Sequence, residues 1–234
     1  MKNKKILVIL GGESGEREVS LDSGRACIKA LKKKGYNVSS FDPKKKILNL
    51  IDKNKTDIIF NALHGKDGED GVAQSYFEYL RIPYTHSGVI SSMNAMDKLI
   101  SKKIFKKNKI LSPNYFTLKS INYKKNTLSK LINKNKIKYP IVVKPINEGS
   151  SIGVNICKNF RVLNNAVKIL IKNYRTLIFE KYIAGQEVQV AVIKKKAIGA
   201  IELKPKRGFY DYKAKYLKSA KTTHIMPANI SKTK

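Results

Sequence analysis

The sequence predicts an α/β fold that begins with a Rossmann-like unit. Residues 5–10 form a continuous apolar run, as expected for a strand buried on both faces of a parallel sheet. A glycine-rich turn at residues 11–18 follows, and then an apolar helical period that starts at Val19 and ends at Gly35. Strand, glycine-rich turn and helix open a βα unit, although Gly11-Gly12-x-x-Gly15 differs from the dinucleotide-binding pattern G-x-G-x-x-G.

The same alternation continues through the first part of the chain. Residues 37–41 and 57–63 predict two further strands, and residues 72–80 predict a helix. The loop at residues 64–71 carries charged residues and three glycines, and it follows a predicted parallel strand, where open α/β sheets bind ligands. His64 taken alone is better explained as a surface loop histidine. Ser91 or Ser92 is expected to cap a long helix that runs toward Lys109.

A second unit is expected from Ser112-Pro113 onward. Residues 115–118, 139–145, 152–157 and 176–183 predict strands, with a lysine-rich helix around residues 128–132 and an amphipathic helix at 162–171. Residues 187–193 and 197–203 predict a hairpin across three lysines. An aromatic and basic segment at residues 208–216 is followed by polar sequence to Lys234.

The most informative stretch is residues 139–154, which delivers Lys144 at the end of an apolar strand and then opens into a loop rich in glycine and serine. Small side chains leave backbone N–H groups exposed to wrap an oxyanion, and the lysine adds a positive charge. Phosphate binding is one interpretation. An ordinary hairpin with a solvated lysine is the other, and this stretch alone does not decide between them.

Composition limits the class of protein. The chain has 234 residues, 42% of them hydrophobic, and no apolar run reaches the roughly 18 residues of a membrane span. Cys27 and Cys157 lie on apolar segments without ligand spacing, so we expect reduced thiols in a cytoplasmic protein. The net charge of +31 suggests a nucleic acid partner. However, only six basic residues are arginines and the lysines are spread along the whole chain, so we expect no specific nucleic acid and no membrane partner.

Six motifs in register resemble those of the D-alanine–D-alanine ligases of the ATP-grasp superfamily. They are Gly11-Gly12-x-Ser14-x-Glu16-Arg17-Glu18-Val19-Ser20, Leu63-His64-Gly65-x-x-Gly68-Glu69-Asp70-Gly71, Met96-Asp97-Lys98, Lys144-Pro145-x-x-Glu148-Gly149-Ser150-Ser151-x-Gly153, Glu180-Lys181-Tyr182 and Phe209-Tyr210-Asp211-Tyr212-x-x-Lys215-Tyr216. The resemblance implies a Rossmann-like N-terminal (pre-ATP-grasp) domain at residues 1–98. It also implies an ATP-grasp α+β domain, with a central lobe at 99–183 and an incomplete C-terminal lobe at 184–234.

The resemblance also implies roles for individual residues. Glu16 would orient the amino group of the first D-alanine, His64 would lie near that substrate's carboxylate, and Ser150 would form a hydrogen-bonded trio with Glu16 and Tyr216. The implied catalytic residues are therefore Glu16, Ser150 and Tyr216. The implied ATP-binding residues are Lys98, Lys144, Ser151, Glu180, Lys181, Tyr182, Ile183, Glu187 and Lys215.

The sequence departs from this family in two places. After Glu187 its only carboxylates are Glu202 and Asp211, and the family's later R-x-D and E-x-N-x-x-P-G motifs are missing. The chain is therefore expected to be a C-terminally truncated ligase. Mg²⁺ needs protein oxygen ligands that this tail does not supply, so the metal ligands are expected beyond Lys234. The second departure is His86, where a glycine is expected.

Three functions remain open at this stage. In the first, the chain is a ligase that uses ATP and Mg²⁺ to join two D-alanines through a D-alanyl phosphate, for peptidoglycan precursor synthesis. Members of this family commonly form homodimers, so a homodimer is expected in that case. Alternatively it is an inactive remnant that still binds nucleotide, or a basic protein that binds nucleic acid.

Overall fold

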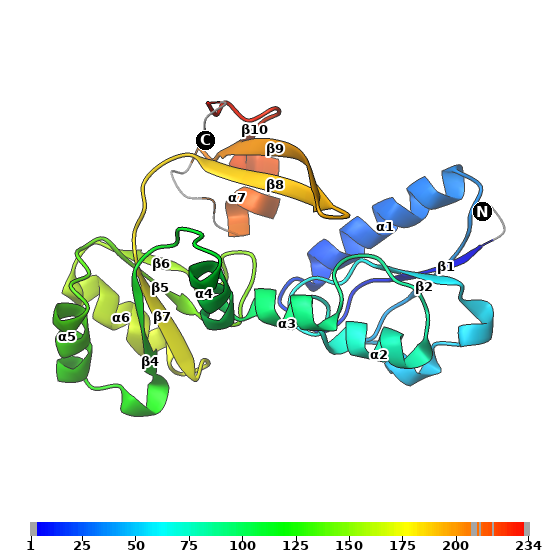
Figure 1. Ribbon diagram of the computed structural model, residues 1–234. Coiled ribbons are helices and arrows are strands. Elements are labelled where there is room, and N and C mark those ends of the chain that lie inside the picture. Colours follow the sequence, from blue (N-terminus) through cyan, green and yellow to red (C-terminus); the bar gives the residue numbers. More distant parts are fainter. Residues whose placement is uncertain (1–3, 207–209, 211, 217, 232–234) are drawn as a thin grey trace. The chain divides into compact units, whose positions relative to one another are not determined.

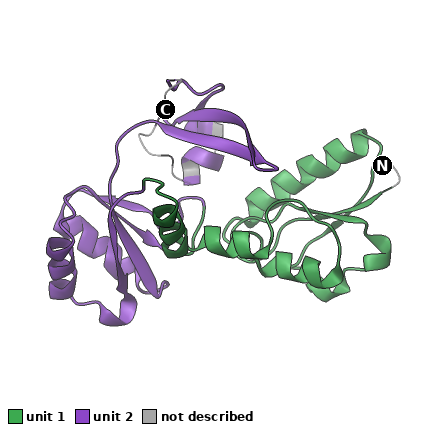
Figure 2. Ribbon diagram, in the orientation of Figure 1, with its two compact units in different colours: residues 1–111, 146–149 green, residues 112–145, 150–234 purple. Residues whose placement is uncertain are grey.

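The computed structural model describes residues 4–206, 210, 212–216 and 218–231. The chain divides into two compact units, drawn in different colours in Figure 2. Unit 1 comprises Met1–Leu111 together with Ile146–Gly149, and unit 2 comprises Ser112–Pro145 together with Ser150–Lys234. The domain boundaries expected from the sequence, after residues 98 and 183, remain predictions. No helix in the described part of the chain has the length and apolar character needed to cross a membrane.

Unit 1 is built on a parallel three-stranded sheet in the order β2-β1-β3 (Figure 1). Its strands are β1 (Lys5–Ile9), β2 (Asn37–Phe41) and β3 (Ile58–Asn61), and its helices are α1 (Arg17–Lys33), α2 (Val72–Leu80), α3 (Val89–Met96) and α4 (Lys98–Lys107). Short 3₁₀ turns occupy Leu48–Leu50 and Lys53–Lys55. The central strand β1 is apolar throughout because both faces are covered, as the continuous run at residues 5–10 predicted.

The alternation of side chains along β1 divides the core of unit 1 into two layers. Ile6 and Val8 pack with partly buried side chains of α1, whereas Leu7 and Ile9 pack in a separate cluster that contains Phe77 of α2. Successive residues of a strand point to opposite faces, so α1 and α2 cover opposite faces of this sheet. The carboxyl ends of β1, β2 and β3 therefore reach one common edge between these layers, and the loops that follow them form the site described below.

The long helix expected up to Lys109 is wrong, because the chain forms two helices there. Helix α3 begins after Gly88, so neither Ser91 nor Ser92 is its N-cap. Asp97 has an extended backbone (ψ 109°), and its side chain accepts hydrogen bonds from the backbone N–H groups of Leu99 and Ile100. An aspartate in this role satisfies the free donors at the start of α4, and it ends α3 at the preceding residue.

Unit 2 contains two antiparallel sheets. The first has the order β4-β7-β5-β6, formed by β4 (Tyr115–Lys119), β5 (Ile141–Pro145), β6 (Asn155–Cys157) and β7 (Thr176–Lys181). Helices α5 (Lys125–Lys134) and α6 (Phe160–Leu170) contribute Leu128 and Leu163 to a core that includes Ile141 and Val143 of β5. A 3₁₀ turn occupies Ser120–Asn122. The expected strand at residues 152–157 is confined to its last three residues.

The second sheet has the order β10-β9-β8 (Figure 1). It comprises β8 (Glu187–Ile193), β9 (Lys196–Lys204) and β10 (Thr223–Ile225), with α7 (Tyr212–Tyr216) and a 3₁₀ turn at Lys218–Ala220. The expected hairpin is confirmed by the antiparallel pairing of β8 with β9. The sequence did not predict α7 in the aromatic and basic segment or β10 in the polar sequence after it. Helix α7 and β10 are short, and β10 exists only because it pairs with β9, a contact that local sequence does not reveal.

Candidate functional site

The loop after β1 is fastened by an ion pair. Gly11 and Gly12 have φ values of +87° and +72°, a conformation that glycine adopts readily. Arg17 binds the carboxylate of Asp42 through two hydrogen bonds of 3.0 and 2.7 Å, and the N–H of Gly12 donates to the same carboxylate. These hydrogen bonds, led by that of Arg17, lower the pKa of Asp42 from 3.8 to about 2. Asp42 follows β2 directly, so it joins the ends of two neighbouring strands.

This fastened loop carries Glu16, which is only 3% exposed. Its backbone N–H donates to Ser14 Oγ at 3.1 Å, and Ser14 Oγ donates to the carbonyl of His64 at 2.7 Å. Two glycines leave room for the carboxylate, because a Cβ at Gly65 or Gly149 would lie 2.9 or 3.1 Å from Glu16 Oε2. The structure thus holds a carboxylate in a narrow space between two glycine loops of unit 1.

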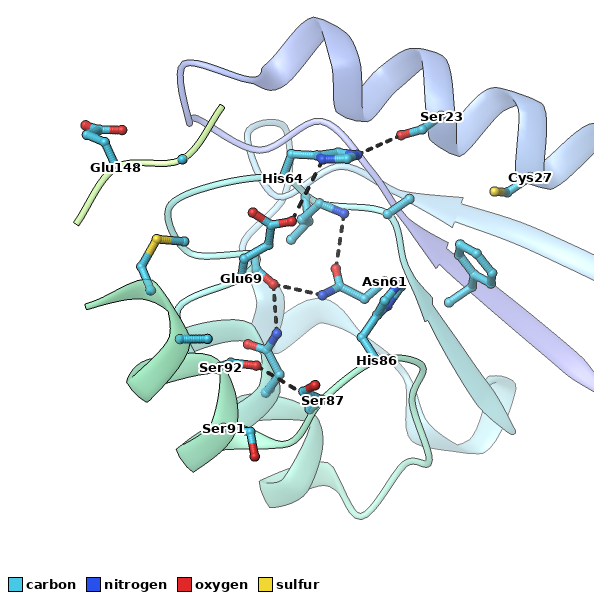
Figure 3. Close-up of a pocket in the computed structure, with 18 of the residues that line it drawn as sticks. Ser23, Cys27, Asn61, His64, Glu69, His86, Ser87, Ser91, Ser92 and Glu148 are labelled. Atoms are coloured by element: carbon cyan, nitrogen blue, oxygen red, sulfur yellow. Dashed lines mark hydrogen bonds and ion pairs between the residues drawn. The ribbon is translucent and has the colours of Figure 1, made fainter. Parts of the chain in front are cut away.

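His64 is the first residue of the loop at residues 64–71 that follows β3 (Figure 3). Its Nε2 is 3.1 Å from Ser23 Oγ of α1, and its Nδ1 is 3.9 Å from Glu69 Oε1. Ser23 also lies within hydrogen-bond distance of the Val19 carbonyl in its own helix. The imidazole is therefore supported from two elements, one face of α1 and the loop at residues 64–71.

Lys98, the first residue of α4, is directed to the short segment of residues 146–149 in unit 1. Its Nζ donates to the backbone carbonyls of Ile146, at 3.3 Å, and Glu148. Its backbone N–H donates to the Ile146 carbonyl at 3.1 Å. The Lys98 ammonium group therefore binds the start of the glycine loop. An anion bound at this loop would compete with the two carbonyl groups for the same ammonium group.

In unit 2, Lys144 and Glu180 form an ion pair of 2.5 Å. The pairing of β5 with β7 explains it. Val142 lies opposite Glu180 and Lys144 lies opposite Ile178, so the two charged residues are diagonal neighbours on one face. The opposite face carries Ile141 and Val143, which pack on the helices. The alternation of side chains along the two strands therefore places both charged residues on the face that α5 and α6 do not cover. Glu180 is nevertheless only 6% exposed.

The loop that follows β5 is tied to the aromatic segment near α7. Ser150 and Ser151 adopt positive φ values of +46° and +62°. Ser150 Oγ is 2.7 Å from the hydroxyl of Tyr216, and Ser151 Oγ donates to the backbone carbonyl of Tyr210 at 3.0 Å. Non-glycine residues in this conformation are strained, and strain of this kind clusters at functional loops. The ordinary hairpin considered above does not explain two serine hydroxyls bound to a segment some sixty residues away.

Glu187 lies at the start of β8 and Lys215 lies in α7. Burial raises the pKa of Glu187, and the charge of Lys215 opposes this rise. The ammonium of Lys215 lies 5.3 Å from the ring centroid of Tyr210, within cation–π range. At the end of β7, two backbone donors already have partners, since the N–H groups of Lys181 and Tyr182 donate to the carbonyls of Asn114 and Pro140.

Among the described residues, no group of three or more histidine, cysteine, aspartate or glutamate side chains is placed to hold a metal ion. Glu202 is 1% exposed and binds Gln186 and Lys204 through Oε1. Asp211 lies outside the described residues. The described side chains therefore do not fit a protein-bound Mg²⁺ site.

Comparisons with known proteins agree across almost the whole chain. The family model for the D-ala D-ala ligase C-terminus matches residues 104–234, and that for the N-terminus matches residues 39–87. A D-alanine–D-alanine ligase of Pelagibacter ubique is 54% identical over 231 residues, which cover 98% of this chain and 74% of that protein. The chain belongs to the D-alanine–D-alanine ligase family.

Solved structures of the D-alanine–D-alanine ligase family have the same fold. The enzyme from Bacillus anthracis has a TM-score of 0.78 at 34% identity, covering 97% of this chain and 73% of that one. The same enzyme complexed with ATP has a TM-score of 0.75 at 28% identity, covering 97% and 72%. The expected α/β class with an ATP-grasp fold is confirmed. The chain spans about three quarters of the length of these family members.

His86 lies where the sequence analysis expected a glycine. Its φ is +77°, a left-handed conformation in which glycine has no steric cost. The imidazole packs edge-on against Phe60 with ring centroids 6.1 Å apart, and its Nδ1 is 2.9 Å from Thr85 Oγ1. The histidine thus adopts a conformation that favours glycine, and two contacts hold its imidazole.

Within each unit the structure brings predicted site residues together. In unit 2, Lys144 meets Glu180, Ser150 meets Tyr216, and Glu187 interacts with Lys215. In unit 1, Glu16 and His64 are linked through Ser14. The trio of Glu16, Ser150 and Tyr216 would join residues of both units, and it stays a prediction.

Sequence reasoning missed Asp42 and did not assign roles to Ser23 or Glu69. Asp42 had a usable signal, because it is a carboxylate directly after a predicted parallel strand. Ser23 had none, since a serine in the middle of a helix is ordinary.

Proposed function

We propose that this chain acts as an ATP-dependent ligase that joins two D-alanine molecules for peptidoglycan precursor synthesis. The 54% identity to a D-alanine–D-alanine ligase over 98% of the chain supports this proposal. The observation that carries it is the tie between the Ser150-Ser151 loop and the aromatic segment, because two covering loops are what an acyl phosphate reaction requires.

The chemistry has two steps. A carboxylate oxygen of the first D-alanine attacks the γ-phosphorus of ATP, which forms D-alanyl phosphate and releases ADP. The amine of the second D-alanine then attacks the acyl carbon, phosphate leaves with the electrons of the broken C–O bond, and the amine loses a proton. Both steps gather negative charge in one place, so cationic side chains and backbone N–H groups must stabilise it.

Unit 1 supplies the site for the first D-alanine. The Glu16 carboxylate would bind the substrate's ammonium group, since it is buried and held between two glycines. His64, supported by Ser23 and Glu69, would lie near the substrate's carboxylate. The fastening of the loop by Asp42 keeps the glutamate in place before the substrate arrives, which reduces the ordering that binding requires.

Unit 2 supplies most of the site for ATP. Lys144 and Lys215 would contact the phosphates, Lys98 of unit 1 would do the same, and the Ser151 loop would cover them. Glu180 would bind the adenine amino group and Glu187 the ribose hydroxyls. Because the N–H groups of Lys181 and Tyr182 are bonded within the protein, the backbone N–H of Ile183 becomes the donor that we assign to the adenine ring.

Turnover is the direct test of this proposal. The 234-residue chain with ATP, MgCl₂ and D-alanine should release phosphate and form D-alanyl-D-alanine, measured by a coupled phosphate assay and mass spectrometry. Lys144→Met should abolish turnover, while Lys138→Met, which alters an exposed lysine of the same unit, should leave it unchanged. Release of phosphate without dipeptide, or equal loss in both variants, would contradict the assignment.

A second candidate function is nucleotide binding without turnover. One observation favours it, since no group of described side chains is placed to hold a metal ion. In that case, calorimetry would detect ATP binding that Lys144→Met weakens, and no phosphate would be released. Strongly salt-dependent RNA binding without ATP binding would instead indicate the third function.

We also propose that the protein is cytoplasmic and forms a homodimer, as expected from its family. Mg²⁺ is expected to accompany ATP, although no step above depends on a ligand that this chain provides. Light scattering coupled to size-exclusion chromatography tests the dimer directly, and a mass of 26.4 kDa would identify a monomer.

A further inference from the structure

Strand β8 (Glu187–Ile193) lies at the edge of the sheet β10-β9-β8 (Figure 1). Its inner side pairs with β9, and no strand of the described chain pairs with its outer side. Successive residues of an antiparallel strand direct their N–H and C=O groups to alternate sides, so about half of these groups in β8 point away from β9. An edge of this kind is a template on which a further strand can form.

Strand β8 lacks the features that usually protect an edge. It has seven residues, whereas the edge strands of the other two sheets, β2, β3, β4 and β6, have three to five. It contains no proline, and no charged residue lies between Glu187 and Lys194. Its pairing with β9 is irregular at one point, but the extra residue there is Ile198 of β9, so β8 itself stays regular. Native edge strands are usually short, charged or bulged, and β8 is none of these.

One face of β8 is apolar and open. Gln189 lies opposite Ile201 of β9, on the face of the sheet that packs against α7. Side chains alternate along a strand, so Val188, Val190 and Val192 share the other face. Val190 and Val192 are 55% and 63% exposed. A strand added to the edge of β8 would place its own side chains beside this row of valines and cover part of it.

The charges around this edge indicate the chemistry of the partner. Lys194, Lys195 and Lys196 are exposed and lie at the turn that follows β8, and the whole chain carries a net charge of +31. Acidic side chains near this turn would be attracted, whereas Glu187 disfavours them at the other end of the strand. A second copy of this chain would bring another +31 to the same surface. The charges therefore favour an acidic partner over self-association.

We propose that the free edge of β8 is a docking site for an extended, acidic segment of a partner protein, which adds a fourth strand to the sheet. The backbone of β8 binds the segment, and the β-branched residues of the segment continue the row of valines. Both existing pairs of this sheet are antiparallel, so we assign the same direction to the added strand. This direction places the acidic residues at the N-terminal end of the segment, beside the lysines of the turn.

A peptide tests this site without ATP or D-alanine, so its outcome is separate from that of the turnover assay. The probe is fluorescein-labelled Glu-Asp-Thr-Val-Thr-Val-Thr-Val, and fluorescence anisotropy follows its binding to the full 234-residue chain. Saturable binding is expected. A peptide that begins with Lys-Lys in place of Glu-Asp should bind at least about tenfold more weakly, because repulsion replaces two ion pairs.

Methylation of the peptide backbone tests whether the probe binds as a strand. N-Methyl groups on all the valines, or on all the threonines, block the N–H groups on one side of an extended peptide. Only one side of an added strand faces β8. One of the two methylated peptides should therefore lose binding, and the other should keep it. Equal effects of the two methylations would refute strand addition.

Two double variants test the role of the turn. Lys194→Gln with Lys195→Gln should reduce the preference for the acidic peptide over the basic one to less than about threefold, because two of the attracting charges are removed. Lys136→Gln with Lys138→Gln removes the same charge from exposed positions elsewhere in unit 2, and the preference should persist. An equal loss of preference in both variants would show that only the net charge of the chain matters.

Hydrogen exchange locates the bound peptide. The amides of β8 should exchange more slowly in its presence, whereas those of β4, an edge strand of the other sheet of unit 2, should not change. Protection of β4 without protection of β8, or no saturable binding up to about 1 mM, would overturn the proposal. A dimer in light scattering that the peptide dissociates would show that β8 pairs with a second copy, and it would overturn the assignment of an acidic partner.

Discussion

Replacing Asp42 with asparagine tests whether the fastening of the β1 loop rests on charge. Asparagine keeps an oxygen that accepts from the N–H of Gly12, but it removes the negative charge that faces Arg17. The pKa of Asp42 falls from 3.8 to about 2 on folding. At about 1.36 kcal/mol for each tenfold change in the proton equilibrium, this corresponds to roughly 2.5 kcal/mol at neutral pH. Partial exposure of the pair reduces the expected loss to about 1–2 kcal/mol.

The pH dependence has a defined sign. Because the pKa is lower in the folded state, the ionised carboxylate stabilises the protein fully above about pH 4, and this stabilisation is lost as the pH falls toward about 2. The stability difference between the native chain and Asp42→Asn should therefore be constant from pH 7 to 5 and shrink below pH 4. Native-state hydrogen exchange of α1 amides measures it within unit 1, which avoids treating a two-unit chain as a two-state folder.

The matched control is Asp22→Asn. Asp22 pairs with Arg25 one turn away in α1, but the two side chains are 80% and 61% exposed, so less than about 0.5 kcal/mol should be lost. Equal losses for the two aspartate variants would refute the reasoning. An Asp42→Asn difference that is the same at pH 3 and pH 7 would also refute it, since the ionised carboxylate would then contribute nothing.

Three further outcomes are expected. Gly65→Ala should raise the KM for D-alanine about tenfold, because the added Cβ would press on the buried carboxylate of Glu16. Gly35→Ala is the control, since it has the same left-handed strain but no atom within 4 Å of the added Cβ. It should change only stability, by about 1–2 kcal/mol. Nucleotide affinity, titrated by fluorescence, should fall as the pH drops through the raised pKa of Glu187. Lys215→Met should move this loss of affinity to higher pH, because it removes the charge that lowers the pKa of Glu187. The same pH dependence in the native chain and in Lys215→Met would count against this role of Glu187. Lys144→Met should destabilise unit 2 by about 3 kcal/mol, measured by native-state hydrogen exchange of the β5 and β7 amides, because its carboxylate partner is buried. A loss below about 1 kcal/mol would show that the pair is solvated.

Much of the fold could be predicted because its signals are local. The apolar run at residues 5–10 predicted a strand covered on both faces, and the helix at residues 72–80 was placed with the bounds that the structure shows. The break between α3 and α4 was missed, because two serines matched the capping preference as well as Asp97 did. Strand β10 was missed because three residues form a strand only where another strand is available to pair with them.

The candidate site divides in the same way. Lys144 and Ser150 were found because they lie in one contiguous stretch with a recognisable pattern. Their partners in the structure, Glu180 and Tyr216, were identified only from the resemblance. The register between strands and the contacts between distant loops cannot be predicted from the neighbouring sequence. Asp42 came from neither source. It acts through side-chain hydrogen bonds to Gly12 and Arg17, which lie 30 and 25 residues away in the sequence.

The discontinuity of unit 1 has a consequence for synthesis on the ribosome. Residues 146–149 belong to this unit, and the backbone and ammonium group of Lys98 bind the carbonyl of Ile146. After residue 111 has been added, 38 more residues must follow before Gly149 exists. At about 5–20 residues per second, this takes roughly 2–8 s. During that interval the nascent chain lacks the segment that binds Lys98, so unit 1 can be completed only after residue 149 has been added.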